Sequence, residues 1–222
     1  MAFSDPATVA HYIDHMARQV PGVHALHRMT QVLLAERVPA EGRVLVLGAG
    51  GGAELDVFAR AQPRWRFVGV DPSAEMLALA ARTLGDAIDR VELVQGYIES
   101  APQIRFDGAT CLLTLHFLDR EQRLRTLMEV RRRLQPGAPL VIAHHSVPDD
   151  AEQKRTWFRR WAAFGQANGL EETNVEARVE LIAHRLPTLD PRAEETLLRE
   201  AGFRQPELFY AAFTFRGWVV YA

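Results

Sequence analysis

Blocks of apolar residues recur along the chain, separated by segments whose apolar positions follow helical spacing. A continuous apolar run is typical of a parallel strand that is buried on both faces. Apolar residues three and four positions apart are typical of helices that cover such a sheet. The predicted strands are 43–48, 65–71, 91–96, 106–114 and 138–145, and the helices between them are 51–61, 73–84 and 119–134. This alternation predicts an α/β fold with a mostly parallel sheet and helices on both faces.

The segments before and after this alternation have a different pattern. Asp5-Pro6 is a typical helix start, and apolar residues from Val9 to Val20 share one helical face, ahead of a second helix over 24–37. Residues 149–186 are helical in composition and contain no strand-like run. A helix beginning at Asp190-Pro191 precedes two predicted strands, 208–215 and 218–221, antiparallel across Arg216-Gly217. We therefore expect a single domain, 1–222, with a helical cap (1–40), a core (41–148), a helical insertion (149–186) and a closing helix and strands (187–222).

A glycine cluster follows the first predicted strand. Val44-Leu45-Val46-Leu47 runs directly into Gly48-Ala49-Gly50-Gly51-Gly52, and Asp71 closes the next strand. Glycine lets the backbone turn sharply and approach a ligand closely, and an acid about twenty residues further on can accept hydrogen bonds from a ribose. The pattern predicts a nucleoside-containing cofactor. Gly48-x-Gly50-x-x-Ala53 also fits the dinucleotide fingerprint, so a nicotinamide-dependent oxidoreductase remains an alternative.

Three further motifs favour S-adenosylmethionine. The first is Asp71 followed by Pro72-Ser73-Ala74-Glu75-Met76-Leu77. The second is Arg105-Phe106-Asp107-Gly108, ahead of a strand that ends near Leu115-His116-Phe117-Leu118-Asp119. The third is Leu134-Gln135-Pro136-Gly137-Ala138, which turns into the fifth strand. In order and spacing these motifs resemble those of class I S-adenosylmethionine-dependent methyltransferases. The resemblance implies a Rossmann-like, seven-stranded, mostly parallel sheet with an antiparallel last strand.

The same resemblance implies a set of cofactor-binding residues. The backbone of the glycine turn would surround the methionyl portion, Asp71 would bind the ribose, and Met76 would pack on the adenine. Tyr97 stands where many relatives have an aspartate for the adenine amino group, so that the backbone of Tyr97 or Ile98 would read the adenine edge. The predicted cofactor-binding residues are Gly48, Ala49, Gly50, Asp71, Pro72, Met76, Tyr97, Ile98 and Leu112. No catalytic residue is predicted, because a sulfonium already carries a good leaving group and the protein mainly has to position the acceptor.

Nearly the whole chain resembles one branch of that superfamily, the carboxy-S-adenosylmethionine synthases of tRNA wobble-uridine modification. The matching segments are Arg18-Gln19-Val20-Pro21-Gly22, Leu113-Thr114-Leu115-His116-Phe117-Leu118, Gln166-Ala167-Asn168-Gly169 and Ala201-Gly202-Phe203. Members of the branch bind S-adenosylmethionine and prephenate and form homodimers. Val23 replaces a tyrosine of the branch and Leu112 an asparagine, which indicates a shared architecture with changed chemistry.

The substrate-contacting candidates are His116, His144 and Arg178. The two histidines follow strands at the carboxyl edge, where open α/β sheets bind ligands. The branch's carboxylate-binding arginine falls near Arg178, and a guanidinium is a natural bidentate partner for a carboxylate. A solvent-facing arginine is the alternative. His11 and His15 lie one helical turn apart but lack a third ligand, so we predict no metal site.

Composition narrows the remaining choices. The net charge is −2, Cys111 is the only cysteine, and no apolar run approaches the roughly 20 residues of a membrane-spanning helix. We expect a cytoplasmic protein without an internal disulfide, a membrane contact or a nucleic-acid partner. The resemblance to the carboxy-S-adenosylmethionine synthases implies a homodimer. The run from Lys154 to Trp161 mixes cations with aromatics as RNA-binding surfaces do, but a helix with its aromatic residues packed inward is favoured. The hypotheses are a methyltransferase acting on a small molecule, a carboxy-S-adenosylmethionine synthase, a non-catalytic S-adenosylmethionine-binding protein and, last, the oxidoreductase.

Overall fold

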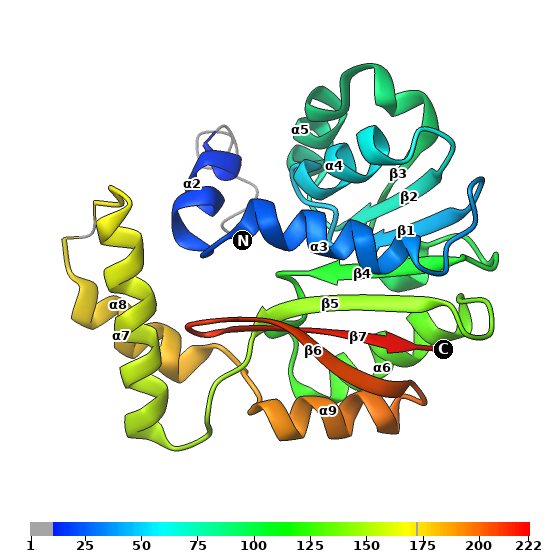
Figure 1. The fold of residues 1–222 in the computed structure, drawn as a ribbon. Coiled ribbons are helices and arrows are strands. Elements are labelled where there is room, and N and C mark those ends of the chain that lie inside the picture. The colour runs from blue at the N-terminus through cyan, green and yellow to red at the C-terminus, as the bar shows by residue number, and fades with distance from the viewer. Residues whose placement is uncertain (1–10, 172) are drawn as a thin grey trace.

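A computed structural model describes residues 11–171 and 173–222, and the predicted helix start at Asp5-Pro6 lies outside the described residues. The strands form one seven-stranded sheet in the order β3-β2-β1-β4-β5-β7-β6 (Figure 1). Their bounds are β1 Arg43–Leu47, β2 Arg66–Asp71, β3 Val91–Gln95, β4 Gly108–Leu112, β5 Pro139–His145, β6 Arg204–Ala212 and β7 Phe215–Tyr221. The first five strands pair in parallel, and β7 pairs antiparallel with both β5 and β6. The predicted Rossmann-like fold class is confirmed.

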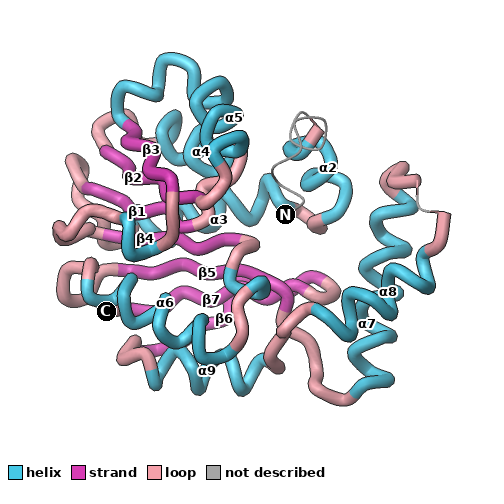
Figure 2. Tube along the Cα trace, turned by 180° about the vertical axis from the view of Figure 1, so that it is seen from behind, coloured by secondary structure: helices cyan, strands magenta, loops and turns pink. Residues whose placement is uncertain are grey.

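Helices cover both faces of the sheet because its central strands are buried on both sides. Val44 and Val46 of β1 belong to one core cluster, whereas Leu45 and Leu47 belong to the other. On the first face lie α3 (Val23–Ala35), α4 (Ala53–Ala61) and α5 (Ala74–Leu84), and on the second lie α6 (Arg120–Arg132) and α9 (Pro191–Glu200) (Figures 1 and 2). Three short 3₁₀ turns complete this part, η2 (Gly85–Arg90), η3 (Ile98–Ser100) and η4 (Leu115–Phe117).

Side-chain caps explain where several of these helices begin. Asp119 and Gln122 form a reciprocal capping box at the start of α6. The carboxylate of Asp190 accepts from two backbone N–H groups of α9, whose first residue is a proline. Ser73 caps α5 by accepting from the backbone N–H of Met76. Such caps satisfy N–H groups that have no partner within the helix. The helices therefore begin within a residue or two of the positions predicted from the sequence.

Three helices, α2 (Tyr12–Gln19), α7 (Ala151–Ala167) and α8 (Val175–Arg185), form a separate group beside one end of the sheet (Figure 1). α7 and α8 lie side by side, and Trp161 of α7 donates its indole N–H to the carbonyl of Gln19 at 2.9 Å. Phe158 and Trp161 are buried, so the inward-packed interpretation of the aromatic run is confirmed at these two positions. None of the described helices is long and apolar enough to cross a membrane.

The chain leaves the sheet and returns to it at two neighbouring points. Ser146, directly after β5, donates its hydroxyl to the carbonyl of Leu189 at 2.9 Å, just before α9. The segment that contains α7 and α8 therefore starts and ends at one place on the sheet.

The last hairpin corrects a prediction from the sequence. The turn lies at Phe213 and Thr214, so Arg216 and Gly217 belong to β7 and not to the turn. β6 also begins at Arg204, earlier than the predicted start at 208. The prediction missed these first residues because β6 is an edge strand with much of its length exposed. An edge strand does not need a continuous apolar run, so its polar first residues gave no strand signal.

Candidate functional site

The glycine turn after β1 folds back onto β2. The backbone N–H groups of Gly48 and Ala49 both donate to the carbonyl of Val70, at 2.8 and 3.0 Å. Gly48 has a φ of 78° and Gly50 a φ of 49°, both in the left-handed region. A Cβ added at Gly48 would lie 2.0 Å from Oγ1 of Thr114. Glycine is therefore required at position 48 for both its backbone conformation and its lack of a side chain.

Asp71 holds this turn in place from the end of β2. Its Oδ2 accepts from the backbone N–H of Gly50 and its Oδ1 from that of Ser73, each at 2.9 Å. Burial raises the pKa of the Asp71 carboxyl, while the two backbone hydrogen bonds oppose this effect. A carboxylate has about four lone-pair positions, so each oxygen can still accept a hydroxyl proton from a ligand.

A cavity of about 630 Å³ opens directly beside this turn and the Asp71 carboxylate. Seven of the predicted cofactor-binding residues line it, namely Gly48, Gly50, Asp71, Pro72, Met76, Tyr97 and Leu112. Ile98 lines an adjoining cavity of about 710 Å³ that shares Gly48, Pro72 and Tyr97 with the first. Ala49 lines neither cavity, because its side chain is buried and faces Gly69 of β2. The structure thus brings together eight of the nine residues around one double cavity.

Sequence reasoning missed several residues of this cavity wall. Tyr12 reaches the wall from α2, and Thr114 and Phe117 reach it from the turn after β4. Burial, followed by the charges of Glu54 and Asp71, raises the pKa of the Tyr12 hydroxyl, so the ring is a neutral hydrogen-bonding group. The only sequence signal for Tyr12 was its place on the apolar face of a helix, which did not indicate a site.

Glu54 lies buried in the first turn of α4, next to the glycine turn. Its Oε1 accepts the hydroxyl proton of Thr110 at 2.9 Å. Burial raises the pKa of Glu54 to about 8, and the Thr110 hydrogen bond only partly opposes the shift. The side chain is therefore mostly protonated at neutral pH. A neutral Glu54 adds no negative charge near the start of α4, where the helix dipole favours a bound carboxylate.

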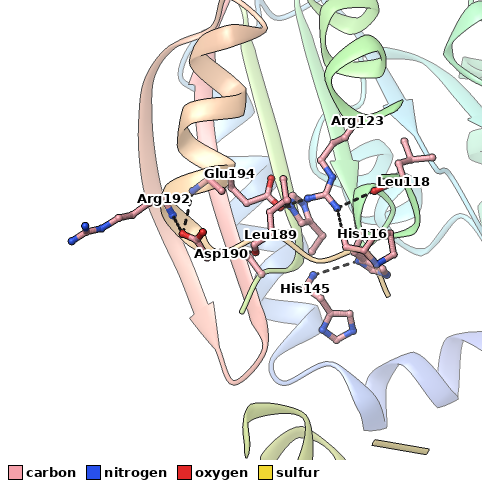
Figure 3. A network of polar contacts seen from close by, with 12 residues as sticks. His116, Leu118, Arg123, His145, Leu189, Asp190, Arg192 and Glu194 are labelled. Carbon is pink, nitrogen blue, oxygen red and sulfur yellow. Dashed lines mark hydrogen bonds and ion pairs between the residues drawn. The ribbon is translucent and has the colours of Figure 1, made fainter. Parts of the chain in front are cut away.

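Arg123 and Glu194 form a buried polar network on the α6 and α9 side of the sheet (Figure 3), and His144 belongs to it as well. Its Nε2 lies 2.9 Å from Oε1 of Glu194, and both side chains are almost completely buried. Arg123 forms an ion pair with Glu194 and donates to the carbonyls of Leu118, at 3.2 Å, and Pro187, at 2.9 Å. Burial raises the pKa of Glu194, but the attraction of His144 and Arg123 outweighs it and the pKa falls below its usual value. The network ties β5, α6 and α9 together.

The other two predicted substrate contacts, His116 and Arg178, are also absent from the cavity lining. His116 is buried, and its Nδ1 accepts from the backbone N–H of His145 at 3.4 Å (Figure 3). Burial, followed by the charges of His145, His144 and Arg123, lowers the pKa of His116 well below its usual value. The Arg178 guanidinium lies 5.3 Å from the Trp161 ring centre, within the α7 and α8 pair. His116, His144 and Arg178 line neither part of the double cavity.

Comparison with known proteins gives this geometry a context. A family profile described as a methyltransferase domain matches residues 44–137, which include the glycine turn and Asp71. The carboxy-S-adenosyl-L-methionine synthase of Chromohalobacter salexigens is 29% identical over 98% of this chain and 82% of its own length. The enzyme of the same name from Klebsiella pneumoniae is 27% identical over 91% of this chain and 83% of its own.

Solved structures share the fold at lower sequence identity. Human N-acetylserotonin methyltransferase, crystallised with S-adenosylmethionine, has a TM-score of 0.66 and 14% identity over 99% of this chain. The CurJ carbon methyltransferase has a TM-score of 0.69 and 18% identity over 98% of this chain. This chain covers 57% and 61% of those two chains, less than two thirds of either.

Proposed function

We propose that this chain transfers a methyl group to a small-molecule acceptor. It is a member of the class I S-adenosylmethionine-dependent methyltransferase superfamily, and its cofactor is S-adenosylmethionine. The observation that carries the proposal is the double cavity beside the Gly48–Gly50 turn and the Asp71 carboxylate. Apolar and aromatic side chains outnumber polar ones in the cavity wall, and Asp71, Glu99 and Arg125 are its charged residues.

The residues present fit the cofactor. Asp71 has acceptor positions left for two ribose hydroxyls, and a side chain at Gly48 would collide with Thr114. Tyr97 and Ile98 would border the adenine, and the first turn of α4 would receive the carboxylate. When bound, S-adenosylmethionine supplies an electrophilic methyl group on a sulfonium. The protein would orient both reactants and exclude water, and it needs no dedicated base to do so.

A carboxy-S-adenosylmethionine synthase that uses prephenate is the second candidate. The two relatives of that name, similar over nearly the whole chain, favour it. The wall of the cavity favours changed chemistry, because Leu112 lines it with an aliphatic side chain where the branch has an asparagine. A non-catalytic S-adenosylmethionine-binding protein is the third candidate. The substrate roles of His116, His144 and Arg178 stay predictions.

Mass spectrometry of the cofactor product separates these candidates. The protein would be incubated with S-adenosylmethionine and prephenate, and separately with a panel of oxygen, sulfur, nitrogen and carbon nucleophiles. S-Adenosylhomocysteine formed with a panel member supports the proposal. A carboxylated cofactor formed only with prephenate would replace it with the second candidate. S-Adenosylmethionine that binds but is never consumed would favour the third.

The cofactor site has its own test in Asp71→Asn, which removes the charge and part of the acceptor capacity at constant size. We expect S-adenosylmethionine affinity, measured by calorimetry, to fall by about 1–3 kcal/mol, because ribose hydroxyls lose charged acceptors. The exposed Asp86 provides a matched control, and Asp86→Asn should bind as the wild type does. Unchanged affinity in Asp71→Asn would remove Asp71 from the site.

We also propose that the chain acts as one methyltransferase domain and as a homodimer, as the family resemblance implies. The cap would contribute Tyr12 to the cavity, and the insertion would cover the acceptor side through its contact with α2. Light scattering coupled to size-exclusion chromatography tests the dimer, since a monomer at micromolar concentration would contradict it.

A further inference from the structure

A second site lies at the opposite edge of the sheet from the double cavity, where β5 begins and β7 ends. A cavity of about 460 Å³ opens there, lined by the arginines Arg37, Arg105, Arg131 and Arg204. They come from four separate parts of the chain, the segment after α3, the loop before β4, the end of α6 and the start of β6. None of its lining residues lines the double cavity.

Contacts with the rest of the protein fix three of these side chains. Arg105 donates to the carbonyl of Leu134 at 2.7 Å. The guanidinium carbon of Arg37 lies 4.1 Å from the centre of the Tyr221 ring. Arg131 packs against Gly202, and its Nε is buried without a hydrogen-bond partner among the described residues. Three of the four guanidinium groups are thus held at the cavity by contacts that leave donors available.

The carboxylates of Glu207 and Glu36 act on Tyr221 of the lining, whose pKa burial and these two charges raise, but neither residue lines the cavity. Aspartate and glutamate are absent from the cavity lining, and none of the four arginines forms an ion pair within the described part of the chain. By contrast, Arg132 and Arg133 of the adjoining cavity both pair with Glu129. The chain as a whole carries a net charge of −2. The cavity therefore concentrates positive charge locally, and like charges held together favour a bound anion.

We propose that this arginine cavity binds a phosphate-bearing small molecule, such as a phosphomonoester or a diphosphate. Guanidinium groups bind phosphate oxygens in a bidentate manner. A group of several guanidiniums matches a phosphate-bearing anion, which carries two or three charges, better than it matches a carboxylate, which carries one. The volume of about 460 Å³ suits a small organic ligand. The inference is independent of the proposed methyl transfer, because the two sites share no lining residue.

Calorimetry with pyrophosphate at constant ionic strength tests the proposal on the full chain. Saturating S-adenosylhomocysteine would fill the cofactor cavity, so that binding there cannot be mistaken for binding at the arginine cavity. We expect pyrophosphate to bind the wild type, and Arg204→Gln to weaken this binding about tenfold or more through the loss of charge-assisted hydrogen bonds. Arg28→Gln is the matched control, because Arg28 is an exposed arginine of α3 that lies outside the cavity lining. It should keep wild-type affinity.

Four outcomes would overturn the proposal. The wild type would fail to bind pyrophosphate, or Arg204→Gln and Arg28→Gln would weaken binding equally, which would indicate general charge attraction. Citrate of similar charge would bind as tightly as pyrophosphate, which would remove the preference for phosphate. A single-stranded RNA that binds through Arg204, with no binding of pyrophosphate, would likewise replace the small-molecule ligand with a polymer. Circular dichroism of each variant would verify that the fold is intact.

Discussion

Two glutamates of α9 pair with two arginines of α6 in opposite environments. Glu194 and Arg123 have side-chain exposures of 1% and 0%, whereas those of Glu200 and Arg120 are 40% and 51%. The pairs join the same two helices through the same chemical groups. Substitution of each glutamate by glutamine therefore isolates the effect of burial on the energy of an ion pair.

We expect Glu194→Gln to lower the free energy of unfolding by about 3–5 kcal/mol. The substitution leaves the buried guanidinium of Arg123 without a carboxylate partner, and its remaining neutral acceptors include the carbonyls of Leu118 and Pro187. His144 would also lose its anionic partner. Glu200→Gln should cost less than about 1 kcal/mol, because its pair is solvated and screened.

Urea denaturation followed by circular dichroism at pH 7 measures both changes. Salt gives a second distinction, since 1 M NaCl should abolish the effect of Glu200→Gln and leave that of Glu194→Gln nearly intact. The double variant Arg123→Met/Glu194→Leu should recover much of the lost stability, because apolar replacement of both partners leaves neither charge unpaired. Equal costs for the two glutamine variants, or a cost below 1 kcal/mol for Glu194→Gln, would refute the reasoning.

Three other predictions concern the cavity and the core. Because burial raises the pKa of Glu54 to about 8, the folded state keeps a proton that the unfolded state releases above about pH 4.5, so stability falls as the pH rises toward 8. Between pH 6.5 and 8, urea titrations should show that the wild type loses about 2 kcal/mol relative to Glu54→Gln, a difference in which the buried histidines common to both proteins cancel. Gly48→Ala should abolish S-adenosylmethionine binding in calorimetry, because the new methyl group would collide with Thr114; full affinity would show that the turn can rearrange. Cys111 should resist iodoacetamide in the native protein and react only in urea, because burial raises its thiol pKa; rapid native labelling would contradict this burial.

The central sheet could be predicted because its strands are buried on both faces, which leaves continuous apolar runs in the sequence. The last hairpin could not, since β6 lies at the edge of the sheet and its first residues are exposed. The apolar and aromatic run of the sequence continues through Phe213, although Phe213 lies in the turn and takes a left-handed φ of 50°. A bulky residue rarely adopts that conformation, whereas Arg216-Gly217 has turn composition.

The cofactor part of the site was predictable because short motifs next to strand ends fix its position. Gly48 and Gly50 follow β1, and Asp71 is the last residue of the adjacent parallel strand β2, so all three lie where the carboxyl ends of the two strands meet. Tyr12 escaped prediction because tertiary packing alone brings α2 to that edge. His144 lies at a strand end too, yet strand side chains point to alternate faces, and the pattern does not reveal that its side chain meets α9.

The bond between Ser146 and Leu189 has a consequence for protein engineering. The chain leaves the sheet after Ser146 and returns to it at Leu189, and one hydrogen bond joins these two residues. The segment between them can therefore be exchanged as a unit without changing the order of the strands. Arg123 adds a second fixed point at Pro187 on the return side. Chimaeras spliced at these positions would transplant the α7 and α8 pair from one relative to another, and would need to keep the contact of Trp161 with Gln19, because α2 carries Tyr12 of the cavity wall.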